Sequence, residues 1–261
     1  MSEEKNTAAN VGRAFVKAGA FVGRNVMSAI DKVDLDVRRH LLQLPLLSYS
    51  LFVSRKNDIE VGIDDGYPPL VFVHGLGGNR GNFLPMSLSL ALRGRRRSYK
   101  VHFESNQTTE QMAESLAAFI EQVKEVTGHS QVEMICHSLG GIVGRLAILD
   151  YDLADSVKTF ISLGSPHHGA MLARFGNTEK INDLRPDSEL MKRINAAKWP
   201  ESVRGVCFWS RNDVIVWPEN SAEIDGCESV DASPFTHYSY LVDPVSWKMV
   251  ANVLEENAKD V

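Results

Sequence analysis

The chain has 261 residues, of which 44% are hydrophobic and 23% are charged. These proportions are typical of a globular protein and exclude a disordered or fibrous one. The 28 basic and 33 acidic residues leave a formal net charge of −5, which argues against a nucleic-acid partner because displacing counterions from phosphates needs a basic surplus. Three cysteines do not indicate a disulfide framework in a chain of this length, and the length itself fits one large domain.

The first sixty residues carry apolar side chains at helical spacing, with basic residues on the opposite side. This pattern predicts an amphipathic helix within an N-terminal helical extension over residues 1–60. The apolar stripe consists of Val11, Phe15, Ala18, Val22, Val26, Ala29 and Val33. Three interpretations stay open: the helix packs on its own domain or on a second subunit as a dimer contact, it lies on an anionic membrane surface as a peripheral contact, or the segment is a disordered tail.

The N-terminus also bears on where the protein acts. Its apolar residues are interrupted by Arg13, Lys17 and Arg24, so no apolar run approaches the ~20 residues of a membrane span. The opening Met-Ser-Glu-Glu is not followed by the basic start, apolar core and cleavage site of a secretory signal. The sequence therefore predicts a cytoplasmic chain, which is membrane-associated only if the N-terminal helix binds lipid.

From Pro68 onward, predicted strands alternate with predicted helices. Parallel strands need long crossovers, so this alternation predicts a mostly parallel central sheet with helices on both faces, in one α/β domain over residues 61–261. The predicted strands are 70–74, 99–103, 132–136, 157–163 and 203–209, and the predicted helices are 108–126, 139–149 and 247–258.

A candidate nucleophile lies in the run CHSLGG at residues 136–141, between a predicted strand and a predicted helix. This is the context in which a Gly-x-Ser-x-Gly elbow exposes a serine hydroxyl on a sharp, strained turn. Gly140 supplies one of the small neighbours that the turn needs, and Cys136 replaces the other glycine. We therefore predict Ser138 as the nucleophile.

Backbone donors for an oxyanion are suggested by the run HGLGG at residues 74–78, at the end of an earlier predicted strand. Glycines there allow backbone N–H groups to turn inward, so the amides of Leu76 and Leu139 are the candidate oxyanion hole. A dinucleotide-binding loop is disfavoured, because Gly81 comes one residue late for Gly-x-Gly-x-x-Gly.

The acid and the base that a nucleophilic serine requires are expected later in the chain. Asp213 follows a predicted strand and His237 precedes the last predicted helix. The order Ser138, Asp213, His237 is the chain order of α/β-hydrolases. Asp225 and Asp231 remain as substitutes for the acid.

Three motifs together resemble bacterial lipases and esterases of the α/β-hydrolase fold, the triacylglycerol-lipase-like branch. They are VHGLGG at 73–78, CHSLGG at 136–141 and LGSPHHG at 163–169, and the resemblance covers about residues 68–258. It implies an α/β-hydrolase fold and a lid or cap segment over about residues 169–200. A packed helical layer is the alternative for this apolar segment.

The resemblance and the triad imply a serine hydrolase that cleaves carboxylic esters through an acyl-enzyme, with a small-molecule ester or lipid as substrate. An acyltransferase, a thioesterase or a phospholipase would use the same triad, and a non-catalytic binding member of the fold is the alternative outside enzymes. We expect no cofactor and no metal, because the chain has neither His-Glu-x-x-His nor Cys-x-x-Cys.

Two groups of side chains have open or structural interpretations. The basic cluster of Arg93, Arg95, Arg96, Arg97 and Lys100 either meets an anionic lipid or phosphate, or forms a solvated turn. The histidines beside the oxyanion and elbow turns, His74 and His137, are interpreted as structural.

Overall fold

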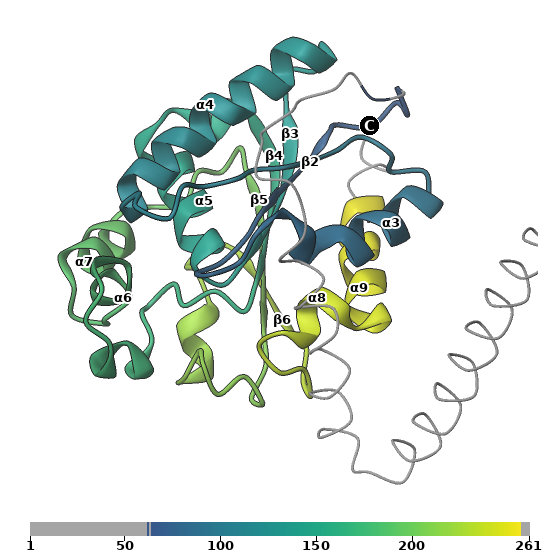
Figure 1. Cartoon of the computed structure of the whole chain (residues 1–261). Coiled ribbons are helices and arrows are strands. Elements are labelled where there is room, and N and C mark those ends of the chain that lie inside the picture. The colour runs from purple at the N-terminus through teal and green to yellow at the C-terminus, as the bar shows by residue number, and fades with distance from the viewer. Residues whose placement is uncertain (1–61, 63, 257–261) are drawn as a thin grey trace, which may run out of the picture. The chain divides into compact units, whose positions relative to one another are not determined.

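The computed structural model of the protein describes residues 62 and 64–256. Their centre is a six-stranded sheet in the order β2-β1-β3-β4-β5-β6, and every neighbouring pair of strands is parallel. The predicted parallel α/β sheet is therefore confirmed (Figure 1). The strands are β1 (Leu70–Val73), β2 (Ser98–Lys100), β3 (Val132–His137), β4 (Val157–Leu163), β5 (Arg204–Trp209) and β6 (Glu228–Asp231).

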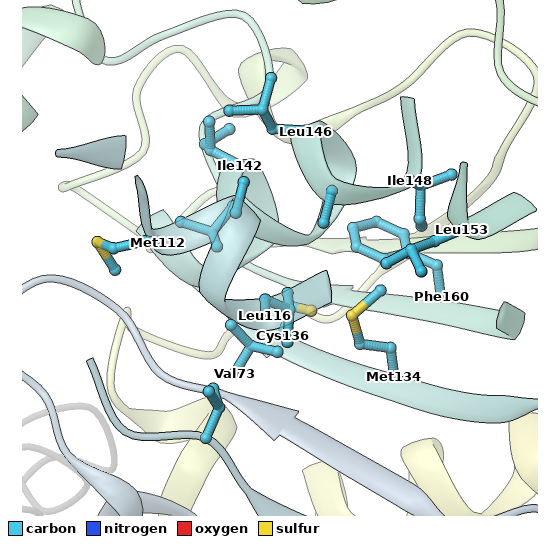
Figure 2. Packing of buried hydrophobic residues seen from close by; sticks show 14 of the residues in the cluster. Val73, Met112, Leu116, Met134, Cys136, Ile142, Leu146, Ile148, Leu153 and Phe160 are labelled. Atoms are coloured by element: carbon cyan, nitrogen blue, oxygen red, sulfur yellow. The ribbon is translucent and has the colours of Figure 1, made fainter. Parts of the chain in front are cut away.

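Helices cover both faces of this sheet. Figure 1 shows α4 (Thr109–Thr127) and α5 (Leu139–Asp150) on one side, and α3 (Leu84–Leu92), α8 (Ser239–Val242) and α9 (Pro244–Glu256) on the other. Since side chains alternate along a strand, Met134 and Cys136 of β3 pack with α4 and α5, whereas Ile135 packs with α3, α8 and α9. Figure 2 shows the first of these two cores. Burial on both faces explains why the central strands are continuous apolar runs.

Local sequence signals explain why some bounds agree with expectation and others do not. α4 begins after a capping box formed by Thr108 and Gln111 and ends at Gly128, which has a left-handed backbone. β4 has the predicted bounds. β2 is shorter than the predicted 99–103, because pairing with β1 ends near Val101.

Among the elements missing from the sequence-based expectation are β6 and α3. β6 is an edge strand of mostly exposed polar residues, so it lacks the apolar run that marks the inner strands. α3 has serines among its leucines and a weak helical periodicity, so its amphipathic pattern is faint.

The segment expected to be a lid or a packed layer forms three short helices: η3 (Met171–Phe175), α6 (Glu179–Asp183) and α7 (Glu189–Ala196). α7 belongs to the core, because Leu190, Met191 and Ile194 are buried with the residues of α4 and α5. In contrast, Phe175 at the end of η3 is 88% exposed. The packed-layer interpretation therefore holds for α7, and a lid remains a proposal for η3.

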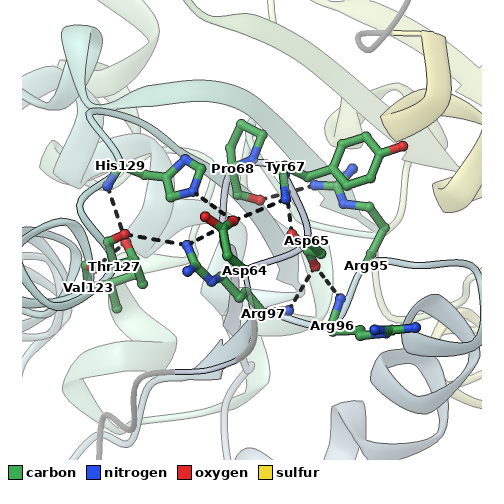
Figure 3. Close-up of polar contacts among 11 residues, drawn as sticks. Asp64, Asp65, Tyr67, Pro68, Arg95, Arg96, Arg97, Val123, Thr127 and His129 are labelled. Atoms are coloured by element: carbon green, nitrogen blue, oxygen red, sulfur yellow. Dashed lines mark hydrogen bonds and ion pairs between the residues drawn. The ribbon is translucent and has the colours of Figure 1, made fainter.

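Three arginines of the basic cluster, Arg95, Arg96 and Arg97, directly precede β2, at the edge of the sheet where the strands begin (Figure 3). Arg95 and Arg97 are buried, so for these two residues both expected environments, a solvated turn and a lipid contact, were wrong. Arg95 forms an ion pair with Glu133 of β3, and Arg97 lies 3.5 Å from a carboxylate oxygen of Asp64. These contacts join the segment before β2 to the start of β3 and to the segment that precedes β1.

The predicted N-terminal extension over residues 1–60, with its amphipathic helix, lies outside the described residues. Within residues 62 and 64–256, no helix combines the length and the apolar character needed to cross a membrane.

Candidate active site

The candidate nucleophile lies on a strained turn between β3 and α5. Ser138 has a φ of 56° and a ψ of −128°, and a positive φ is costly for a residue with a side chain. The start of α5 approaches the end of the neighbouring strand β1 so closely that a Cβ at Gly140 would lie 2.3 Å from the carbonyl oxygen of Val73. Cys136 is accommodated because a glycine faces it: a Cβ at Gly144 would lie 2.9 Å from the Cys136 sulfur.

The structure brings Ser138, Asp213 and His237 together from the ends of three strands. His237 Nε2 lies 2.9 Å from Ser138 Oγ, and His237 Nδ1 lies 2.9 Å from Asp213 Oδ2. Because an ionised carboxylate only accepts hydrogen bonds, Nδ1 is the donor, and Nε2 is left to accept the serine proton. Both Asp213 and His237 are buried, so the contact between these two side chains is shielded from water.

The carboxylate of Asp213 is itself held in place. Its second oxygen, Oδ1, accepts hydrogen bonds from the backbone amides of Ile215 (3.0 Å) and Val216 (3.1 Å). These two amides form part of the turn that follows β5. The loop after β5 therefore fixes the orientation of the acid toward the imidazole.

The two substitute acids lie in other surroundings. Asp231 ends β6, accepts a hydrogen bond from the amide of Ser233 (2.8 Å) and pairs with Arg211 (3.4 Å). Hydrogen bonds from Ser233 hold the pKa of Asp231 below its usual value. Asp225 lines a separate hollow beside Trp199. The structure thus joins Asp213, and neither substitute, to His237.

The candidate oxyanion residues border one cavity next to the nucleophile. Leu76 and Leu139 both line this cavity, which has a volume of about 460 Å³. Gly75 backs the serine so closely that a Cβ there would lie 2.7 Å from Ser138 Cβ. Leu139 is the first residue of α5, and amides at a helix N-terminus have no intrahelical acceptor. The assignment of the two amides as oxyanion donors remains a proposal.

Three histidines near the site are buried and neutral. Burial, together with the neighbouring His237, lowers the pKa of His137 to about 3. Burial also lowers the pKa of His74, and it holds the pKa of His167 well below the usual value. His74 lies 3.0 Å from the carbonyl oxygen of Gly75, and His167 lies 2.7 Å from Ser162 Oγ.

Sequence reasoning missed two contacts to the loop that carries His237. His137 Nε2 lies 2.8 Å from the carbonyl oxygen of His237, and Ser210 Oγ donates to the carbonyl oxygen of Phe235 at 2.6 Å. Both carbonyls belong to the backbone, so no side-chain motif announces either contact. Strand alternation gives the only signal, since it places His137 on the face opposite to Cys136.

Known proteins resemble this chain in sequence over part of its length. Triacylglycerol lipases of Pseudarthrobacter phenanthrenivorans and Burkholderia plantarii are each 31% identical over 116 residues, which is 41% of this chain. The match covers 35% of the first relative and 32% of the second. The chain thus spans about a third of the length of these curated relatives.

Solved structures resemble it over a larger share. The mature lipase BlEst2 of Bacillus licheniformis has a TM-score of 0.65 at 18% identity and covers 73% of this chain and 93% of its own. Lipase B of Aspergillus fumigatus has a TM-score of 0.61 at 18% identity and covers 74% of this chain and 53% of its own. At these identities the similarity shows the fold alone, which is that of an α/β-hydrolase.

A family model described as palmitoyl protein thioesterase matches residues 69–199, half of the chain. This range contains Ser138, Leu76 and Leu139, whereas Asp213 and His237 follow it. With the lipase relatives, the match confirms the resemblance found in the sequence motifs. The chain therefore belongs to the palmitoyl protein thioesterase family and shares the α/β-hydrolase fold of bacterial lipases and esterases.

Proposed function

We propose that the protein is a serine hydrolase that cleaves carboxylic esters through an acyl-enzyme. The observation that carries this proposal is the position of His237, which contacts Ser138 Oγ and Asp213 Oδ2 at 2.9 Å each. The serine stands on a strained elbow beside a cavity. A hydroxyl, an oriented imidazole and space for a substrate are the parts that acyl transfer requires.

The proposed reaction has two halves. His237 Nε2 takes the proton of Ser138 as the serine oxygen attacks the ester carbonyl, and Asp213 stabilises the imidazolium that forms. The amides of Leu76 and Leu139 donate to the oxyanion, and one such donor is typically worth about 3 kcal/mol. The imidazolium then protonates the leaving alcohol. Water attacks the acyl-enzyme with His237 again as the base.

The proposed substrate is an ester or a lipid, since the triacylglycerol lipases supply the sequence similarity. The cavity beside the serine supports a substrate with an apolar part and a polar part. Phe103 and Met112 line it together with His102, Ser105 and Lys180. The acyl chain and the alcohol part of the substrate would lie against these apolar and polar side chains.

A thioesterase is the second candidate, because the family model that matches this chain is described as palmitoyl protein thioesterase. The same triad serves both reactions, and the leaving group is then a thiol. A preference for thioesters over oxygen esters of the same acyl chain separates the two functions.

The test is hydrolysis of p-nitrophenyl esters of increasing acyl length, next to acyl thioesters of matched length. Fluorophosphonate labelling reports the nucleophile independently of the substrate, and Ser138→Ala is the control for both measurements. We expect turnover and labelling in the wild type and neither in the variant. Labelling without turnover of any ester would favour the thioesterase or an acyltransferase. Neither activity nor labelling would favour a binding protein.

Three further parts of the proposal rest on the sequence pattern. We place the protein in the cytoplasm, and we assign residues 1–60 to a helical extension that contacts protein or an anionic membrane surface. We also assign the exposed η3 to a lid over the site. Liposome sedimentation and light scattering of the whole chain and of a chain lacking residues 1–31 distinguish the membrane contact from the protein contact.

A further inference from the structure

His137 immediately precedes the nucleophile, yet its side chain points away from the face that Cys136 occupies. Alternation along β3 turns it toward the face covered by α3, α8 and α9, where the loop before α8 carries His237. His137 is buried, and its ring centroid lies 4.7 Å from that of His237. The neighbour of the nucleophile therefore packs against the base.

A hydrogen bond joins the two residues through the backbone. His137 Nε2 lies 2.8 Å from the carbonyl oxygen of His237, and a carbonyl oxygen only accepts. His137 is therefore the donor, in the tautomer with its proton on Nε2. Because its pKa is about 3, the ring stays neutral and keeps this proton assignment at every pH at which an imidazole base works.

The loop that carries the base is held at two carbonyls by two different strands. Ser210, which follows β5 and precedes the acid by three residues, donates to the carbonyl oxygen of Phe235 at 2.6 Å. His137, at the end of β3, donates to the carbonyl oxygen of His237. The segments that carry the nucleophile and the acid therefore each hold the base at a point outside the triad.

We propose that His137 is a positioning residue, whose Nε2–H group ties the backbone of His237 to the elbow that carries Ser138. Residues 137 and 138 are consecutive, so a shift of the elbow moves the serine and the base together. Without this bond, the side-chain contacts of His237 and the bond from Ser210 to Phe235 remain, but neither ties the backbone of His237 to the elbow. This inference rests on the proposed serine hydrolase function and adds a positioning residue outside the triad.

The test compares two substitutions that separate the contribution of the aromatic ring from that of the N–H donor. His137→Phe keeps an aromatic ring of similar size and loses the donor, whereas His137→Gln loses the ring and keeps an N–H at a similar distance from the backbone. A positioning role predicts that Gln is the better substitute, and a packing role predicts that Phe is. His167→Gln removes another buried histidine, whose side chain contacts Ser162 Oγ, and is the matched control.

The first measurement is p-nitrophenyl butyrate hydrolysis. We expect His137→Phe to lower kcat by about 10²-fold, the effect of a misplacement near 1 Å, with KM changed less than about threefold because the substrate is not touched. His137→Gln and His167→Gln should stay within about fivefold of the wild type. Equal losses in Phe and Gln, or a better Phe variant, would overturn the proposal.

The second measurement needs no turnover. Amide hydrogen exchange over residues 235–242 should become roughly tenfold faster in His137→Phe, as expected for one lost hydrogen bond, and should return toward the wild-type rate in His137→Gln. Unchanged exchange in both variants overturns the positioning role even if the wild type hydrolyses no ester. An inactive wild type with the expected exchange pattern overturns the proposed function and retains the positioning role. If His137→Phe does not fold, His137→Asn replaces it, since its amide ends short of the carbonyl.

Discussion

The two edges of the sheet both bury titratable side chains, but they use them differently. Where the strands begin, Arg95 faces Glu133 and Arg97 faces Asp64 (Figure 3), so each cation meets an anion. Where the strands end, a single carboxylate orients an imidazole that reaches a serine on a strained turn.

Burial of titratable groups therefore does not by itself indicate a catalytic site. Paired opposite charges satisfy one another and resist change, as at the first edge. The second edge combines an imidazole able to exchange a proton, a non-glycine residue at positive φ and an adjacent cavity of about 460 Å³. Strain and space beside a polar cluster are the features that distinguish a candidate active site. We therefore expect substitutions where the strands end to lower activity and substitutions where the strands begin to lower stability.

The largest expected effect is the loss of the nucleophile. Ser138→Ala should lower kcat by about 10⁶-fold, because the covalent step disappears and only the oxyanion donors and binding remain. Hydrolysis of p-nitrophenyl butyrate and fluorophosphonate labelling measure this loss, and far-ultraviolet circular dichroism checks the fold. Labelling retained in the variant would move the nucleophile to another residue.

The acid is expected to have the second largest effect. Asp213→Asn should lower kcat by about 10⁴-fold, since the amide no longer fixes the imidazole tautomer that accepts the serine proton. Asp231→Asn is the matched control, because Asp231 pairs with Arg211 outside the triad, and it should leave kcat within about threefold. The assignment of the acid fails if the two variants exchange these outcomes.

A substitution at the edge where the strands begin should lower the free energy of unfolding and leave kcat unchanged. Glu133→Gln leaves Arg95 buried beside a neutral group, and removing one partner of a buried pair costs about 3 kcal/mol or more. Glu189→Gln removes an exposed partner of Lys192 and should cost less than about 1 kcal/mol. Urea denaturation measures both. A fall in kcat with unchanged stability in Glu133→Gln would contradict the assignment of this edge to stability and of the other edge to activity.

Acid should destabilise the protein through its buried histidines. The folded-state pKa of His137 is lowered from 6.5 to about 3, so the unfolded chain binds more protons between these values, and stability falls as the pH falls through this window. Each histidine that stays neutral lowers the free energy of unfolding by about 1.4 kcal/mol per pH unit below 6.5. Urea midpoints from pH 7 to pH 5 should show this slope.

A variant of a buried histidine away from the triad provides the control for that slope. His167 is also held neutral by burial, so His167→Gln should make the dependence on pH shallower. An unchanged slope in this variant would mean that other groups cause the acid sensitivity.

The smallest effect is expected at the exposed η3 helix. Phe175→Ser should change the free energy of unfolding by less than about 0.5 kcal/mol, because the side chain is 88% exposed. If η3 acts as a lid for long acyl chains, KM for a long-chain p-nitrophenyl ester rises while KM for the acetate stays constant. Equal KM changes for both esters would argue against the lid.

The parallel α/β architecture and the chain order of the three triad residues could be predicted from the amino-acid sequence. β4 has its predicted bounds because an apolar run buried on both faces is visible in the sequence, and β6 was missed because an edge strand needs no such run. The elbow was visible because the close approach of α5 to the end of β1 leaves no room for a side chain at Gly140, two residues after the serine.

Which charged side chains are buried, and which backbone atoms bind the residues around the base, depends on the tertiary packing and could not be predicted from the sequence. Arg95 and Arg97 stand in a run of basic residues that resembles a solvated turn, and they are buried because carboxylates about thirty or more residues away in the sequence reach them. The hydrogen bond from His137 to the carbonyl of His237 joins residues 100 positions apart. Every residue except the last carries a backbone carbonyl, so the sequence does not indicate which one accepts the hydrogen bond. That choice depends on how the strands and loops pack.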